Sequence, residues 1–223
     1  MLISKKIVQQ ISVITSELVT HGLCNHSNYP SSKEIGENTV KIYCNNKHKS
    51  IALKNNSYYS TYKELVDTNN YNLKMLDGAL IQMTYEFTDN TISKHRLAFF
   101  PSPFLEEFQN NPDIYIEDEI FAEVIKKNIV PFPLRFDFDA DKNSFIELNH
   151  PKSHLTLGQY KNCRIPVSAP LTPYHFIVFI LRHFYHAAFI KHSEKITVFD
   201  DVFAITIEKN ESSAVHVRVP MST

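Results

Sequence analysis

The sequence contains little glycine and little cysteine, and each shortage argues against a class of protein. It has 4 glycines in 223 residues, and neither of the phosphate-binding patterns GxGxxG and GxxxxGK[ST] occurs. Its 3 cysteines are widely spaced and form no CxxC pair, which argues against a disulfide framework or a cysteine zinc site. Nucleotide hydrolysis and dinucleotide redox chemistry are therefore disfavoured, and a reducing compartment is expected.

The chain also lacks a long apolar run and a net charge of one sign. Its most apolar stretch, residues 176–181, is too short to span a bilayer. The N-terminal residues lack the apolar segment and cleavage site of a signal peptide, so we predict a cytoplasmic protein with no membrane segment. The formal net charge of −1 produces no overall field that attracts nucleic acid, and only local basic patches can do so.

Apolar residues are present in sufficient number for a folded core. Hydrophobic residues make up 43% and aromatic residues 12% of the chain, a composition that disfavours disorder. No internal repeat and no clear linker divides the sequence. We therefore predict a single domain over residues 1–223.

Hydrophobic periodicity predicts an antiparallel sheet built from hairpins and packed with about three main helices. The helices are expected at residues 3–23, 118–127 and from 172 to about 190. The hairpins are expected to pair residues 79–87 with 92–100, 134–138 with 145–148, and 203–207 with 214–219. A further strand is expected near residues 40–44, after a polar loop at residues 25–38. This order predicts an α+β fold rather than an alternating α/β fold.

The densest group of reactive side chains lies between residues 134 and 164. Its candidate catalytic residues are Arg135, Asp137, Asp139, His150, His154 and Arg164. In a strand, the first three share one face, with the two carboxylates about 7 Å apart. That spacing allows Asp137 and Asp139 to share a divalent cation, magnesium or manganese. The alternative is an ordinary half-exposed strand with an Arg–Asp pair.

The two histidines admit a second chemistry. Pro151 disfavours helical geometry at His150, so the fold must bring His150 and His154 together. They would then serve as general acid and base on a phosphodiester, with Arg135 or Lys152 neutralising the developing charge. The alternative is a loop held by histidine hydrogen bonds. Arg164 stands in an apolar context, where it either pairs with a carboxylate or binds an anionic ligand.

Several sequence motifs resemble a bacterial family, domain-of-unknown-function family 2290. The matching segments are residues 77–83 (DGALIQM), 94–103 (KHRLAFFPSP), 135–139 (RFDFD), 150–159 (HPKSHLTLGQ), 163–167 (CRIPV) and 170–173 (PLTP). The resemblance covers nearly the whole chain and implies no particular activity. A shorter stretch resembles toxins of bacterial toxin–antitoxin pairs, in which an Arg-x-Asp strand precedes a histidine–proline–histidine loop; the matching positions are Arg135, Asp137, His150 and His154.

These observations support two hypotheses of different kinds. The first is a nuclease-like effector of a prokaryotic defence or toxin–antitoxin system, including phage defence, that acts on nucleic acid. The second is a non-catalytic subunit or adaptor that binds a partner protein of the same operon, in which Arg135, Asp137 and Arg164 form a buried structural network.

Overall fold

A single nine-stranded sheet dominates the computed structural model, which describes residues 2–44, 56–104, 131–160 and 162–220. Its strands are β1 (Cys24–Ser27), β2 (Ser31–Gly36), β3 (Thr39–Tyr43), β4 (Leu73–Met75), β5 (Leu80–Thr88), β6 (Thr91–Phe100), β7 (Leu134–Asp139), β8 (Ser153–Leu157) and β9 (Ile165–Pro166). The main order is β1-β4-β5-β6-β7-β8-β9, with β3 also pairing β5, and β2 pairing β3. Every pair of these strands is antiparallel.

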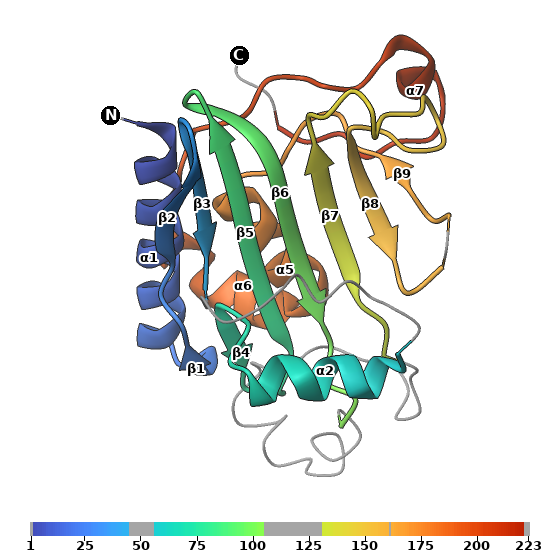
Figure 1. Ribbon diagram of the computed structural model, residues 1–223. Coiled ribbons are helices and arrows are strands. Elements are labelled where there is room, and N and C mark those ends of the chain that lie inside the picture. Colours follow the sequence, from blue (N-terminus) through green and yellow to red (C-terminus); the bar gives the residue numbers. More distant parts are fainter. Residues whose placement is uncertain (1, 45–55, 105–130, 161, 221–223) are drawn as a thin grey trace.

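Helices cover one face of this sheet and one end of the other, which confirms the α+β fold (Figure 1). The helices are α1 (Ile3–Thr20), α2 (Tyr58–Asp67), α5 (Pro173–Phe184), α6 (His186–His192) and the short α7 (Lys209–Ser213), with a 3-10 turn at Ser193–Lys195. In Figure 1, α5 and α6 lie behind the sheet, whereas α2 crosses the lower end of its front. No helix among the described residues is long and apolar enough to cross a membrane.

The main core lies between α1, α5 and the rear face of the sheet. The apolar positions of α1 recur at helical spacing and are buried, as at Ile7, Ile11 and Ile14. Alternation along β5 points Met83 and Tyr85 into the same core. The helix α5 begins where predicted, because the Thr172 hydroxyl accepts the His175 backbone N–H and a proline occupies the first turn.

A second, smaller core leaves most of the front face polar. The helix α2 places Tyr62 and Leu65 against Leu80, Ala98 and Phe100 at one end of β5 and β6. Beyond that end, the front-facing positions of β5 and β6 are occupied by polar and charged residues. The candidate site lies on this part of the sheet.

Two of the predicted hairpins are wrong. The strand β7 pairs with β8 at residues 153–157 rather than with residues 145–148. The segment between them instead forms a loop, in which Ile146 and His150 make an isolated bridge. At the C-terminus, the expected hairpin is replaced by α7, which begins with a capping box of Glu208 and Glu211.

Other expectations need smaller corrections. The polar segment at residues 25–38 is not a loop, because it contains β2 and most of β1. The helix expected from residue 172 to 190 is split into α5 and α6 at Tyr185, which has φ −134° and ψ 54°. The helix expected at residues 118–127 lies outside the described residues.

Candidate anion-binding site

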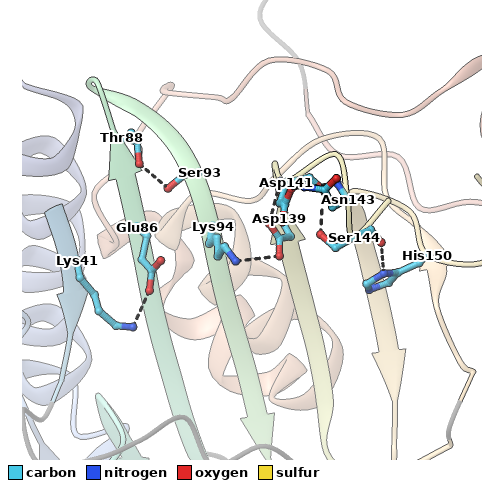
Figure 2. Close-up of polar contacts among 10 residues, drawn as sticks. All are labelled: Lys41, Glu86, Thr88, Ser93, Lys94, Asp139, Asp141, Asn143, Ser144 and His150. Carbon is cyan, nitrogen blue, oxygen red and sulfur yellow. Dashed lines mark hydrogen bonds and ion pairs between the residues drawn. The ribbon is translucent and has the colours of Figure 1, made fainter. Parts of the chain in front are cut away.

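The pairing of the strands places positive and negative side chains alternately in a row across the front of the sheet. Lys41 on β3 pairs with Glu86 on β5, Glu86 pairs with Lys94 on β6, and Lys94 pairs with Asp139 on β7. Directly paired residues share a face, so the four side chains form one line (Figure 2). Lys41 Nζ lies 2.6 Å from Glu86 Oε1, and Lys94 Nζ lies 3.1 Å from Asp139 Oδ2. Both pairs are partly exposed and contribute little to stability.

The neighbouring row centres on Asp137. Register places Arg96 of β6 on one side of Asp137 and His154 of β8 on the other. Arg96 Nε donates to Asp137 Oδ1 at 3.0 Å, and Arg135 Nε, two residues away on β7, donates to Oδ2. The Asp137 carboxylate therefore bridges two guanidinium groups, a charge-assisted arrangement in a largely buried position.

These contacts decide the charge of Asp137. Burial alone raises the pKa of the Asp137 carboxyl, but the guanidiniums of Arg135 and Arg96 outweigh burial and hold the pKa below its usual range. The carboxylate is therefore ionised at neutral pH. Its negative charge faces His154, whose Nε2 lies 3.8 Å from Asp137 Oδ2.

His154 is oriented by the backbone behind it. A carbonyl oxygen only accepts, so the contact of 2.9 Å between His154 Nδ1 and Pro151 O places a proton on Nδ1. Burial lowers the pKa of His154, although Asp137 opposes that shift. His154 is therefore neutral at physiological pH, and its Nε2 carries the lone pair on the side of Asp137.

His150 is held close to His154 by the loop after β7. Its Nδ1 contacts the Ser144 carbonyl oxygen, which again places a proton on Nδ1 and leaves Nε2 as the basic nitrogen (Figure 2). The loop is fixed by its own hydrogen bonds, because Asp141 N donates to Asp139 Oδ1 at 2.9 Å and Asn143 N donates to Asp141 Oδ1 at 3.0 Å. The two imidazole ring centres lie 5.2 Å apart.

These rows line an open groove of about 740 Å³ on the front of the sheet. Its charged lining residues are Lys33, Lys41, Lys94, Arg96, Arg135, Arg164, Glu86, Asp137 and Asp139. Six cationic side chains thus face three carboxylates, an excess of three positive charges that contrasts with the whole-chain net charge of −1. The groove is locally basic although the protein is not.

The chain matches the family described as "Uncharacterized conserved protein (DUF2290)" over residues 23–219. It is a member of the DUF2290 family. The matched residues include all nine strands and every residue that lines the charged groove, whereas α1 precedes them. No curated protein and no solved structure matches the chain.

All six candidate residues from the sequence line this one groove of the DUF2290 chain: Arg135, Asp137, Asp139, His150, His154 and Arg164. Arg164 was expected to pair with Asp137 or Asp139 or to bind an anion. The cationic side-chain partners of Asp137 are Arg96 and Arg135, and within the described ranges no ion pair involves Arg164. Its position favours the second alternative.

Sequence analysis missed the contribution of the neighbouring strands. Lys94 and Arg96 alternate with His95 and Leu97 along β6, so their placement on the polar face was readable from the period of two. Their pairing with β7 was not, because β6 and β7 are far apart in the sequence and the local sequence of neither strand shows how the two align. Arg96 is the most consequential omission, since it holds Asp137.

The predicted divalent cation at Asp137 and Asp139 stays a prediction. Over the ranges that the structure covers, no group of three or more His, Cys, Asp or Glu side chains is arranged to hold a metal ion. Both carboxylates have cationic partners, Arg96 and Arg135 for Asp137 and Lys94 for Asp139. A metal ion binding here would have to displace at least some of these cations.

Proposed function

We propose that this DUF2290 chain is a nuclease-like protein that binds nucleic acid along the charged groove and cleaves its phosphodiester backbone. The observation that carries the proposal is the placement of two neighbouring imidazoles beside an excess of cationic side chains in one groove. Phosphate groups supply most of the affinity of proteins for nucleic acid through lysine and arginine. Imidazoles are the side chains most often used for proton transfer near neutral pH.

The charge balance of the groove favours a polyanion over a small neutral ligand. Lys41, Lys94, Arg96 and Arg135 each contact a carboxylate of the groove. Asp137 neutralises only one of its two guanidiniums. Lys33 and Arg164 form no ion pair with any residue that the structure describes, so their charges are available to a ligand.

We assign a role to each candidate residue on this basis. Arg164 and Arg135 would contact the phosphate, because a guanidinium offers paired donors that match its oxygens. His150 and His154 would transfer protons. Asp137 would orient and stabilise His154, and Asp139 would hold Lys94 in the groove. A magnesium or manganese ion bound by Asp137 and Asp139 remains the alternative route.

The wider role proposed for this activity is that of an effector in prokaryotic defence or in a toxin–antitoxin pair. It rests on the short resemblance around Arg135, Asp137, His150 and His154. Induced expression in bacteria tests it: a toxic effector arrests growth when intact, and the His150→Ala variant does not. Equal growth of both cultures would remove the effector role.

A second candidate function is a non-catalytic adaptor that binds a partner protein. The observation that favours it is the bridge of Arg96, Asp137 and Arg135, which has the form of a structural network that ties β6 to β7. In that case His150 and His154 would serve only to hold the loop. Substitutions in the network would then lower stability, while no variant would alter any reaction.

The deciding experiment is a cleavage assay on mixed RNA and DNA substrates, with and without magnesium and manganese. Wild type is compared with His150→Ala and with His216→Ala, a matched control whose Nδ1 also contacts a backbone carbonyl (Ala214 O, 3.0 Å) but which does not line the groove. We expect cleavage by wild type and by the control, and at least a hundredfold loss in His150→Ala. Equal rates for all three proteins, or no cleavage by wild type, would refute the nuclease proposal.

A further inference from the structure

We infer that the substrate is RNA and that cleavage uses the ribose 2′-hydroxyl as the nucleophile, with His154 and His150 as the proton-transfer pair. This inference rests on the proposed nuclease function and names its substrate class. Two observations support it. The imidazoles of His150 and His154 are held in fixed orientations. The carboxylates of Asp137 and Asp139 already have cationic side chains as partners.

Both histidines present the same nitrogen for chemistry. Nδ1 of His154 donates to Pro151 O, and Nδ1 of His150 donates to Ser144 O. In each ring, Nε2 is therefore the atom that gains or loses a proton. The two fixed rings, with centres 5.2 Å apart, can address one phosphodiester from two sides.

His154 serves as the base and His150 as the acid. A proton that arrives at His154 Nε2 is stabilised by the Asp137 carboxylate at 3.8 Å. Asp137 is kept ionised for that task by Arg96 and Arg135. His150 is half-buried whereas His154 is buried, so His150 is the more accessible of the two to solvent.

Such a pair of imidazoles suits an intramolecular nucleophile. The 2′-hydroxyl of RNA lies next to the phosphorus it attacks, and groups held in this way react with effective concentrations of about 10⁵–10⁸ M. A histidine that removes the hydroxyl proton is then a sufficient activator. The groove contains both proton-transfer groups and cationic groups, and this reaction needs both kinds.

The step balances without a further reactant. His154 Nε2 takes the proton of the 2′-hydroxyl while the 2′-oxygen forms a bond to phosphorus. The bond between phosphorus and the 5′-oxygen breaks, and that oxygen takes a proton from His150 Nε2. The products are a 2′,3′-cyclic phosphate and a 5′-hydroxyl. Arg164 stands in the groove to offset the negative charge that accumulates on the phosphate oxygens.

The test uses the full chain and three pools of randomised oligonucleotides: RNA, DNA, and RNA with 2′-O-methyl groups, each with EDTA and with magnesium. Randomised sequence removes dependence on an unknown recognition site. We expect cleavage of RNA in EDTA, no cleavage of the other two pools, and 2′,3′-cyclic phosphate ends by mass spectrometry. Both His150→Ala and His154→Ala should lose at least a hundredfold in rate, whereas His216→Ala should not.

The possible failures are distinguishable. Cleavage of DNA, a strict requirement for magnesium, or 3′- or 5′-monophosphate ends as the first products would overturn this inference while leaving the nuclease function intact. Cleavage of no pool under any condition would overturn both. Since a His154→Ala variant can lose activity by misfolding, its circular dichroism spectrum and melting temperature must match those of His216→Ala; an active, folded His154→Ala variant would also overturn the inference.

Discussion

Asp137 on β7 and His154 on β8 are directly paired across the sheet, with 3.8 Å between Asp137 Oδ2 and His154 Nε2. The same carboxylate accepts hydrogen bonds from Arg96 and Arg135. Three adjacent strands are thus joined at one side chain. Any change at Asp137 acts both on the stability of the sheet and on the protonation of His154.

The first prediction concerns the carboxylates of β7. Asp137→Asn should lower the free energy of unfolding by about 2 kcal/mol, because it leaves two partly buried guanidiniums without their anion. Asp139→Asn is the matched control on the same strand and should cost less than about 1 kcal/mol, since its partner Lys94 is largely exposed. Urea unfolding measures both values. Equal losses in the free energy of unfolding would show that the Asp137 bridge stabilises the fold no more than the ion pair of Asp139 does.

The second prediction concerns a buried histidine beneath the groove. His95 Nε2 accepts the Leu171 backbone N–H at 3.1 Å. Burial lowers the pKa of His95 to about 4. Asp137 acts to raise this pKa, and His154 acts to lower it further. The unfolded chain binds this proton near pH 6.5, so the folded state is favoured above that pH and loses stability as the pH falls towards 4.

The expected loss from His95 is roughly 3 kcal/mol across this window. Urea unfolding at pH 7, 6 and 5 measures it. His95→Gln keeps a hydrogen-bond acceptor but cannot titrate, so its unfolding free energy should depend less steeply on pH than that of wild type. Parallel curves for the two proteins would mean that another group causes the dependence.

The third prediction concerns the acidic member of the charged row. Glu86→Gln removes a carboxylate from the groove and releases Lys41. Affinity for a nucleic-acid backbone should rise roughly two- to fivefold at low salt, in line with the energy of an exposed ion pair. Fluorescence anisotropy measures the change, which should shrink as salt is added. An unchanged affinity would indicate that the ligand does not pass over β3 and β5.

The fourth prediction compares two glycines with positive φ. Gly22 (φ 67°) has open space around it, whereas a Cβ on Gly78 (φ 83°) would lie 3.1 Å from Ser102 Oγ and 3.3 Å from the Tyr62 hydroxyl. Gly22→Ala should therefore cost only the backbone strain, about 1 kcal/mol. Gly78→Ala should cost about 2–3 kcal/mol, because crowding adds to strain. Thermal unfolding ranks the two, and the reverse order would contradict the tight turn between β4 and β5.

The sequence predicted those parts of the fold that depend on local periodicity. The helix α1 and the hairpin of β5 and β6 have long, regular patterns and short connections, and both were predicted. The partner of β7 was not, because the polar residues 140–143 were interpreted as the turn of a hairpin. They instead begin a longer loop, held by Asp141 and Asn143, that carries His150 before the chain returns as β8.

The same limit applies to the candidate site. The two-residue alternation of side chains along a strand predicted that Arg135, Asp137 and Asp139 share one face. The structure brings His150, His154 and Arg164 to that face as well. Local sequence contains no information on which strand lies beside β7. Arg96 and Lys94, contributed by β6, were therefore absent from the predicted site although they hold both carboxylates.

The most direct test of the central claim, that the front of the sheet binds nucleic acid, is the affinity of wild type and two charge-reversal variants for a fluorescent 2′-O-methyl RNA. Arg164→Glu changes the groove, and Lys5→Glu changes an exposed position of α1 outside the groove. We predict that Arg164→Glu weakens binding at least tenfold, about 1.4 kcal/mol, and that Lys5→Glu changes it less than twofold. Equal affinities for the three proteins, or no binding by wild type, would contradict the claim.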